Sequence, residues 1–466
     1  MPSSFAATAT AKRTSTAFPT DEVPLAQVSG NHDVSQPGPR GGEQSRTTAA
    51  SFPKGVVIVC HVVQRAAVIS LHTSPLLQPG SGDSGGMNVY VRELGSALAQ
   101  AGVETTTFTR ADRAGLPDEI VVEPGHRVVH IQAGPHHLPK EALAEVTDEF
   151  RHGVLDWIAR NERPDVIHAN YWLSGVVGHR LKHELDVPFV STFHTLARVK
   201  AAHGDPEPPW RDRAEAEIVH CADAICVSCD EEADQFRLHY GDPQGRLEII
   251  APGVEHAFFA PGDQAGARRA LGFDLDRPML LFVGRIQPLK GPDVAIRALA
   301  ALGDPQARLV IVGGASGIEG DVETMRAHSL VDELGLSDRV QFVEPQPHHI
   351  LSTYYRAADV VVAPSRSESF GLVALEAAAC GIPVVASAVG GLLSLVDDGR
   401  TGRLIEGRDP GDYAAAIAEI LGDDGLRDQM SAAAVERARR YTWSFAAARL
   451  RRLYGDLTVR ELVTCR

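Results

Sequence analysis

Two glutamates, Glu368 and Glu376, stand eight positions apart in the sequence and have the right chemistry to hold a sugar. A carboxylate accepts hydrogen bonds, so a pair of carboxylates at the edge of a ligand site suits hydroxyl donors. The same spacing is also typical of a helix whose first glutamate faces the helix dipole and whose second faces water. On spacing alone both interpretations stay open.

Two cations, Arg285 and Lys290, follow the apolar run 278–283 and predict a diphosphate site. Arginine offers a planar fork of donors and lysine a compact charge, so together they can neutralise a phosphate leaving group. The alternative is a pair of solvated loop cations. The nearby glutamate pair makes the ligand interpretation the better one.

A glycine-rich stretch, which includes Gly80, Gly82, Gly85 and Gly86, connects the apolar run 65–75 to a predicted helix over 87–100. Glycines let the backbone approach a ligand closely, and a helix N-terminus attracts anions. The segment lacks the Gly-Lys-Ser/Thr ending of a Walker loop. A tight turn without a ligand is the alternative.

The polar residues of the first half are more dispersed. His194 and Thr195 end the predicted strand 188–195, where a histidine is either structural or faces a cleft. Lys140, Tyr171 and Arg211 are so far apart in sequence that spacing alone cannot single them out.

The elements that position these residues alternate between short apolar strands and amphipathic helices. This alternation predicts an α/β protein built from right-handed βαβ units and parallel sheets. We expect a disordered tail over 1–52, a first domain over 53–254 and a second over 255–442. In the second domain, a helix is predicted to open at Ser367 and end at Gly381, and the last segment, 443–466, begins with an amphipathic helix.

Composition narrows the class of partner. The chain has 466 residues, enough for two domains, and a formal net charge of −15, which argues against nucleic acid or an anionic membrane as the main partner. It has no apolar run long enough to span a membrane and no apolar core of a secretion signal near its start. The six cysteines predict reduced thiols and a cytoplasmic protein. Cys226 and Cys229, with Cys221 and His220 nearby, could suggest zinc, but buried thiols are the expectation.

Three strings carry a family resemblance: HTSPLLQPGSGDSGGMNVYV, FVGRIQPLKGPD and SESFGLVALEAAACGIPVVA. Over residues 65–443 the chain resembles the D-inositol-3-phosphate glycosyltransferases of actinobacterial mycothiol biosynthesis. The resemblance implies two facing Rossmann-like domains of the GT-B type with an interdomain cleft, and a terminal helix that packs back on the first domain. It also implies a retaining transfer of N-acetylglucosamine from UDP-N-acetylglucosamine to 1D-myo-inositol 3-phosphate by a cytoplasmic homodimer.

The resemblance also implies site residues. Those implied to hold inositol phosphate are His72, Asp83, Ser84, Gly85, Gly86, Met87, Asn88, Lys140, Tyr171, Thr195 and Arg211. Those implied to hold the UDP-sugar are Gln78, Pro79, Gly86, Arg285, Lys290, Gln346, Glu368 and Glu376. The implied catalytic residues are His194, Arg285, Lys290 and Glu368. A shortened stretch before Arg211 leaves Arg213 as an alternative for that position.

No organic cofactor is expected, but the resemblance implies a structural magnesium ion bound mainly by backbone oxygens near Tyr355, Arg356, Ala358 and Ile382. Three other functions stay open. One is a related glycosyltransferase with another phosphorylated or lipid acceptor, such as a sucrose-phosphate synthase. The others are a UDP-sugar epimerase and a sensor that binds a nucleotide sugar without turnover.

Overall fold

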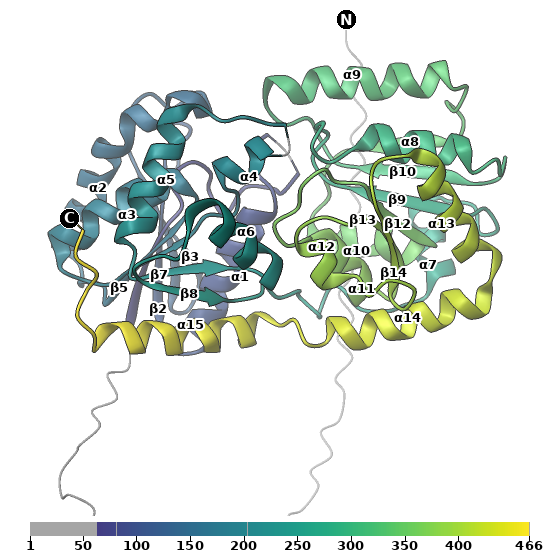
Figure 1. Ribbon diagram of the computed structural model, residues 1–466. Coiled ribbons are helices and arrows are strands. Elements are labelled where there is room, and N and C mark those ends of the chain that lie inside the picture. Colours follow the sequence, from purple (N-terminus) through teal and green to yellow (C-terminus); the bar gives the residue numbers. More distant parts are fainter. Residues whose placement is uncertain (1–62, 81, 203, 466) are drawn as a thin grey trace, which may run out of the picture. The chain divides into compact units, whose positions relative to one another are not determined.

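The computed structural model describes residues 63–80, 82–202 and 204–465, without the side chains of 317–319. The predicted disordered tail over 1–52 lies outside the described residues. Within them, helices flank two separate sheets, as Figure 1 shows. The predicted α/β class with parallel sheets is confirmed.

The first sheet contains eight strands among the described residues. They are β1 (Arg65–Ile69), β2 (Glu104–Arg110), β3 (Glu119–Glu123), β4 (His126–Ile131), β5 (Val166–Asn170), β6 (Phe189–Thr192), β7 (Ala224–Val227) and β8 (Arg246–Ile249). Their order across the sheet is β3-β4-β2-β1-β5-β6-β7-β8, and only the edge strand β3 runs antiparallel to its neighbour.

Helices cover both faces of the first sheet. They are α1 (Gly86–Gln100), α2 (Thr147–Arg160), α3 (Trp172–Leu185), α4 (Ala197–Ala202), α5 (Pro209–Cys221) and α6 (Asp230–Tyr240), with a 3₁₀ turn, η1, at Lys140–Val146. Side chains alternate along β1: Ala67 and Ile69 join the apolar cluster under α2, α3 and α5, while Ala66 and Val68 join the one under α1. Burial on both faces explains the nearly continuous apolar run of this strand.

The second sheet has six parallel strands within the described chain. They are β9 (Met279–Val283), β10 (Arg308–Val312), β11 (Val340–Val343), β12 (Val360–Ala363), β13 (Val384–Ser387) and β14 (Gly402–Ile405), in the order β11-β10-β9-β12-β13-β14. The helices that follow in this half are α7 (Gln264–Leu271), α8 (Pro292–Ala301), α9 (Gly317–Glu333), α10 (His348–Ala357), α11 (Leu372–Ala379), α12 (Gly391–Leu395), α13 (Pro410–Gly422) and α14 (Asp424–Ala438).

The last helix, α15 (Trp443–Thr458), returns to the first sheet. Its inward residues share one apolar cluster with α1 and with alternate residues of β1. In Figure 1 it is the yellow helix labelled beneath β2 and β8. The amphipathic pattern of 443–457 is therefore explained by the packing of α15 against the first sheet and α1.

One local helix prediction is wrong. The helix expected to open at Ser367 begins only at Leu372, because Gly371 adopts a left-handed φ of 100° at its N-cap and leaves Glu368 in the preceding loop. The short helix α4 was not predicted at all.

The cysteine prediction is wrong for one pair. Cys221 and Cys465 form a disulfide across 244 positions, a proximity that the sequence hides because it depends on the return of α15. Cys226, Cys229 and Cys380 are buried free thiols, as expected for the first two. In the described part of the chain, no helix is long and apolar enough to cross a membrane.

Candidate active site

Strand order places the predicted site residues. In each sheet the chain starts in the middle, fills one side and then crosses to the other, so a switch point lies between β1 and β5 and between β9 and β12. Ligands bind at such points, outside the carboxyl ends of the strands. The loops that follow these four strands carry His72 to Gly85, Tyr171, Arg285 to Lys290, and Glu368.

A cavity of about 290 Å³ opens among these loops. Several predicted residues line it: Pro79, Gly85, Gly86, Met87, His194, Thr195, Arg285, Lys290, Gln346, Glu368 and Glu376. The structure thus brings the predicted catalytic group and most of the predicted UDP-sugar group to one site. Gln78 lies at its edge, where its side-chain amide donates to the main-chain oxygen of Gln346 at 2.8 Å.

Arg285, which is half-buried, brings a positive charge to this cavity. Its Nη1 donates to Ser316 Oγ at 3.1 Å, and burial lowers the pKa of the guanidinium, although Asp83 and Glu368 oppose that effect. A Cβ at Gly85 would lie 3.2 Å from Arg285 Nε, so glycine allows the loop to lie against the guanidinium. Since the partner Ser316 is neutral, the positive charge of Arg285 is available to an anionic ligand.

Lys290 and Glu368 form an ion pair with 2.5 Å between Nζ and Oε2. The two side chains are about one-fifth exposed, at 23% and 20%. Both belong to loops, and the main-chain N–H of Arg366 ties these loops together by donating to Leu289 O at 2.8 Å. A diphosphate next to Lys290 would compete with Glu368 for the ammonium group and free that carboxylate for a sugar hydroxyl.

Glu376 projects from α11 and is almost fully buried, at 7% exposed. Tyr355 donates its hydroxyl hydrogen to Glu376 Oε2 at 2.7 Å. Burial raises the pKa of Glu376 to about 7, while this hydrogen bond lowers it. The carboxyl group is therefore protonated about as often as it is ionised near neutral pH.

His194 follows β6 in a left-handed conformation with φ 61°, which is rare for a residue with a side chain. Its Nε2 lies 2.9 Å from Asn170 Oδ1, and its ring meets the edge of Tyr90 at 4.9 Å between centroids. Burial lowers the pKa of His194 to about 3, so the ring is neutral. Ser369, from the second half of the chain, donates to the main-chain oxygen of His194.

The dispersed polar residues of the first half meet in a second cluster, beside the cavity. Arg211 Nη2 donates to Thr195 Oγ1 at 3.1 Å and to the main-chain oxygen of Thr195 at 3.0 Å. Its Nη1 lies 3.3 Å from the hydroxyl oxygen of Tyr171. Tyr171 is also left-handed, with φ 76°, at the end of β5. Thr195 lines the cavity and so connects it to this cluster.

Lys140 and His72 complete the cluster. Lys140 Nζ lies 5.4 Å from the centre of the Tyr171 ring, and the His72 ring is 4.3 Å from it. The buried Nδ1 of His72 has no hydrogen-bond partner among the described residues. Burial, together with Lys140 and other nearby positive groups, lowers the pKa of His72 well below its usual value. A neutral imidazole nitrogen without a partner, next to two cations, suits a hydroxylated anion.

Sequence reasoning missed the carboxylates that hold Arg211. Glu215 Oε1 lies 2.7 Å from Nε and Glu207 Oε1 lies 2.8 Å from Nη1. The Arg211–Glu215 spacing of four residues on one helix was a visible signal. The structure also distinguishes the two candidate arginines: Arg211 is 2% exposed, whereas Arg213 points to solvent. Asn170 and Ser369, which hold His194, were also missed.

Other predicted residues shape the glycine-rich loop. Asn88 is buried and donates to Thr73 Oγ1 and Ser74 O at 2.8 and 2.7 Å, while Gly85 N donates to its Oδ1 at 2.9 Å. Ser84 is also buried, and its main-chain oxygen accepts from Gly80 N. Asp83 is exposed at the tip of the loop. In this structure Asn88 and Ser84 shape the loop, and their predicted contact with inositol phosphate stays a prediction.

The residues predicted to bind magnesium fit that ion poorly. Tyr355 O already accepts from Ala358 N at 3.0 Å, and Ala358 O accepts from Gln264 Nε2 at 2.9 Å. Arg356 contributes a positive charge, and Ile382 lies in the turn before β13. Magnesium prefers carboxylate and water oxygens in octahedral geometry, which these neutral carbonyls do not supply. The magnesium site stays a prediction, and no step below depends on it.

Comparison with known proteins identifies the family. Residues 263–437 match the model for glycosyl transferases group 1, and residues 85–253 match that for the glycosyl transferase 4-like domain. D-inositol 3-phosphate glycosyltransferase 2 of Catenulispora acidiphila is 46% identical over 405 residues, which is 84% of this chain and 95% of that protein. The chain belongs to the D-inositol 3-phosphate glycosyltransferase family. A second member, from Kribbella flavida, is 47% identical over 399 residues, covering 83% of this chain and 94% of its own length.

Solved structures place this glycosyltransferase in the GT-B fold. Sucrose-phosphate synthase from Thermosynechococcus elongatus aligns with a TM-score of 0.80 and 36% identity, over 84% of this chain and 99% of that one. Anabaena HepE in complex with UDP and glucose aligns with a TM-score of 0.69 and 20% identity, over 84% of this chain and all of that one. At this identity HepE supports the fold only. The predicted family, fold class and enzyme class are thus confirmed.

Proposed function

We propose that this glycosyltransferase moves N-acetylglucosamine from UDP-N-acetylglucosamine to 1D-myo-inositol 3-phosphate with retention of configuration, as a step of mycothiol biosynthesis. One observation carries the proposal: Thr195 lines the cavity and also binds Arg211. Thr195 therefore connects the cavity, which is lined by cations and glutamates, to the second cluster, which suits a phosphate monoester. The names of the curated relatives support the same acceptor.

On the donor side, Arg285 and Lys290 hold the diphosphate and stabilise the charge that grows on it as the sugar departs. Glu376 accepts hydrogen bonds from the ribose. Glu368 leaves Lys290 as the diphosphate binds and accepts from sugar hydroxyls. His194 is neutral and orients the sugar, since its left-handed backbone is fixed by Ser369 and its ring is held by Asn170.

The arrangement of the carboxylates favours displacement on one face of the sugar. The glutamates that line the cavity are Glu368, paired with Lys290, and Glu376, bonded to Tyr355. Neither is an unengaged nucleophile for the anomeric carbon. In the proposed step, the acceptor hydroxyl attacks from the face that the diphosphate leaves, and the departing phosphate oxygen takes the proton of that hydroxyl.

On the acceptor side, Lys140 and Arg211 bind the phosphate with the hydroxyls of Tyr171 and Thr195. His72 Nδ1 accepts a hydrogen bond from a ring hydroxyl. This cluster also argues against a UDP-sugar epimerase, which needs no second phosphate site. Cytoplasmic location and a homodimer stay predictions.

A product assay tests the proposal. Purified protein is incubated with UDP-N-acetylglucosamine and inositol 3-phosphate, unphosphorylated inositol or a phosphorylated hexose, and products are identified by mass spectrometry and anomeric NMR. We expect an α-linked product with inositol 3-phosphate alone. The phosphorylated hexose is included because the sucrose-phosphate synthase is 36% identical. Preference for it, or conversion of donor without any acceptor, would refute the assignment.

A further inference from the structure

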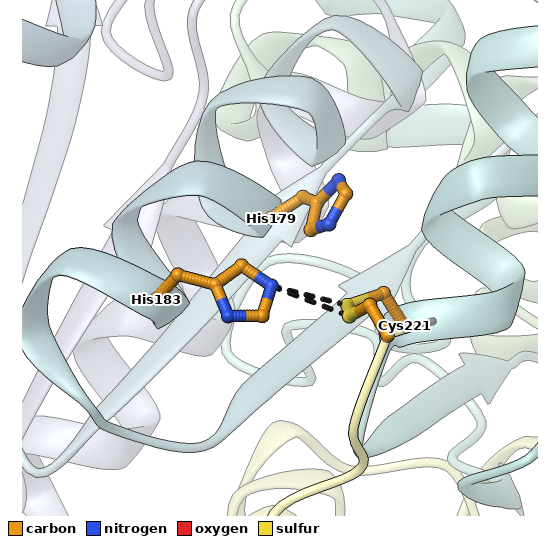
Figure 2. A group of neighbouring side chains, drawn as sticks. His179, His183 and Cys221 are labelled. Carbon is orange, nitrogen blue, oxygen red and sulfur yellow. Dashed lines mark hydrogen bonds between the residues drawn. A yellow bond between two sulfur atoms is a disulfide. The ribbon is translucent and has the colours of Figure 1, made fainter.

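A group of four metal-binding side chains lies on the first half of the molecule, and none of them lines the active-site cavity. His179 and His183 come from α3, Cys221 is the last residue of α5, and Cys465 belongs to the segment after α15. One ligand atom from each lies within 4.8 Å of the others. Figure 2 shows His183 directed at the paired sulfurs, with His179 one helical turn away.

The four side chains lie close to one another. His183 Nε2 lies 3.4 Å from Cys221 Sγ and 3.2 Å from Cys465 Sγ. The two imidazole rings are 5.3 Å apart between centroids, because residues four apart on a helix project from the same face. Cys221 is buried, while His179 and Cys465 are half-buried. The group is thus open on one side to an ion from solvent.

We propose that, when the Cys221–Cys465 disulfide is reduced, His179, His183, Cys221 and Cys465 bind a zinc ion. Two thiolates and two imidazoles are a common donor set for structural zinc. The group contains no carboxylate, which disfavours magnesium and calcium. Two thiolates balance the charge of Zn²⁺, so the occupied site is neutral.

The geometry needs only a small contraction. Zinc bonds of about 2.3 Å to sulfur and 2.0–2.1 Å to nitrogen place tetrahedral ligands roughly 3.3–3.8 Å apart. The four ligand atoms, already within 4.8 Å, approach this spacing through side-chain rotation once the sulfurs separate. Two of the ligands come from one helix, so that half of the site is preformed.

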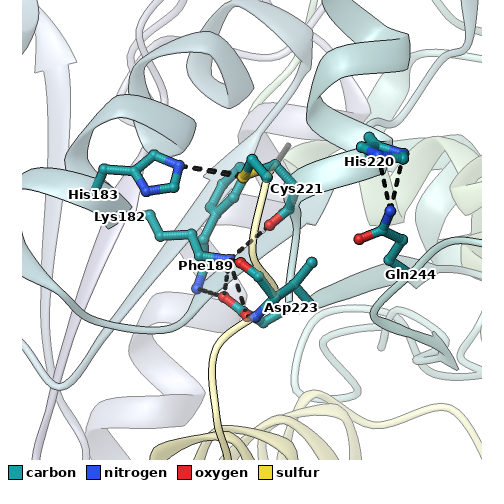
Figure 3. Close-up of a disulfide and its surroundings, with 9 residues drawn as sticks. Lys182, His183, Phe189, His220, Cys221, Asp223 and Gln244 are labelled. Carbon is teal, nitrogen blue, oxygen red and sulfur yellow. Dashed lines mark hydrogen bonds and ion pairs between the residues drawn. A yellow bond between two sulfur atoms is a disulfide. The ribbon is translucent and has the colours of Figure 1, made fainter.

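Hydrogen bonds to the main chain hold α3, the end of α5 and the C-terminal segment together independently of the disulfide. Lys182, on α3 and only 2% exposed, donates to the main-chain oxygens of Cys221 and Val463 at 2.7 and 2.9 Å. Asp223 pairs with Lys182 at 3.0 Å and accepts from Val463 N at 2.6 Å. Figure 3 shows Lys182, Asp223 and Cys221 of this network beside the disulfide. Cys465 therefore stays close to α3 after reduction.

The disulfide and the zinc site exclude each other, because they use the same sulfur atoms. Two molecules of a small thiol, RSH, reduce the disulfide: the S–S bond breaks, two cysteine thiols form, and RS–SR is released. Zn²⁺ then displaces the two thiol protons. A disulfide-forming oxidant reverses the sequence and releases the ion. Either state ties the C-terminal segment to α5, but zinc also ties it to α3.

Metal analysis of the full chain tests the proposal. The protein is reduced with a phosphine, exchanged into zinc or cobalt, and washed free of unbound metal. We expect about one metal ion per chain and a cobalt–thiolate charge-transfer band. Cys465→Ser and His183→Asn should lose that metal and that band. His220→Asn is the matched control, since His220 is next to Cys221 but faces Gln244, 2.8 Å away (Figure 3).

A second measurement avoids substitutions. In the reduced wild-type chain, zinc should slow alkylation of Cys221 and Cys465 at least tenfold but leave the rate at Cys380 unchanged. A reduced chain that binds no metal, or Cys465→Ser protein that keeps the ion and the cobalt band, would overturn the proposal. Equal alkylation of Cys221 with and without zinc would also overturn it.

Discussion

Two guanidinium groups, that of the buried Arg211 and that of the half-buried Arg285, have opposite surroundings. Arg211 is held by two carboxylates, Glu207 at 2.8 Å and Glu215 at 2.7 Å. Arg285 bonds to the neutral Ser316, and no ion pair within 4.0 Å reaches it from the described residues. The first arrangement preserves the shape of a pocket, whereas the second keeps a charge available for a ligand.

The pKa shifts of the two groups follow this difference. Burial disfavours the charge on Arg211, but Tyr171 and the carboxylate of Glu215 outweigh it and raise its pKa. Burial lowers the pKa of Arg285, and Asp83 and Glu368 do not fully compensate. Arg211, whose charge is already neutralised by carboxylates, thus positions the acceptor. Arg285, whose charge is not neutralised by the protein, stabilises the departing diphosphate.

The largest expected effect is on stability. Arg211→Ala removes the ion-pair partner of Glu215, which is 0% exposed and keeps only the neutral donors Ala197 N and the Tyr240 hydroxyl, so it should lower the free energy of unfolding by about 3–5 kcal/mol. Urea denaturation without substrates measures it. Arg213→Ala removes an exposed arginine two residues away and is the control, with an expected change within about 0.5 kcal/mol. Equal losses in both variants would mean that the Arg211–Glu215 pair does not stabilise the fold.

The next effect is on catalysis. Lys290→Ala should lower kcat by roughly 10²–10³-fold, or about 2.7–4 kcal/mol, as loss of one charge-stabilising donor does. Because the Lys290–Glu368 pair is partly exposed, unfolding should change by no more than about 1 kcal/mol. Steady-state kinetics and urea denaturation on the same samples separate the two quantities.

Arg366→Ala is the control for that variant, since Arg366 is exposed and lies in the loop that carries Glu368. It should keep nearly normal turnover. Near-normal turnover of Lys290→Ala itself would remove Lys290 from the chemical step and weaken the contrast between the two halves of the site.

The sequence predicts the donor side of the site better than the acceptor side. Arg285 and Lys290 lie in one short run, and so do Glu368 and Glu376, so each run could be interpreted before the fold was known. The four acceptor-side residues lie in or next to different elements and meet only in the folded chain, so their grouping came from family resemblance: Lys140 begins η1, Tyr171 follows β5, Thr195 follows β6 and Arg211 is in α5. The pairing of Arg211 with Glu207 and Glu215 was also missed, although each glutamate is four residues from Arg211 in the sequence, because that spacing alone does not tell a buried ion pair from an exposed one.

The third effect is on acceptor binding. Lys140→Ala should raise KM for inositol 3-phosphate roughly 10–150-fold, the range of about 1.5–3 kcal/mol for a hydrogen bond to a charged group. Affinity for UDP-N-acetylglucosamine, measured by calorimetry, should not change. Unphosphorylated inositol, if used at all, provides the control, because the variant and the wild type should use it equally poorly. An equal rise in KM for inositol 3-phosphate and for unphosphorylated inositol would show that Lys140 does not recognise the phosphate group.

The smallest effect is a pH dependence on the donor side. The pKa of Glu376 is raised to about 7, so its carboxyl group is mostly neutral at pH 6 and mostly ionised at pH 8. An ionised carboxylate is the better acceptor for ribose hydroxyls. Affinity for UDP-N-acetylglucosamine should therefore rise by up to about tenfold, or about 1.4 kcal/mol, between those pH values.

The intact nucleotide sugar is the right probe, because its diphosphate is esterified at both ends and does not titrate in this range. Glu376→Gln should bind it with an affinity that is the same at pH 6 and pH 8. Folding should respond with the opposite sign: a raised folded pKa means that the free energy of unfolding falls as pH rises from about 4.5 towards 7. If wild type and Glu376→Gln show the same pH profile for binding, ionisation of Glu376 does not contribute to donor affinity, and the contrast with the carboxylate-paired acceptor side then depends on Arg285 and Lys290.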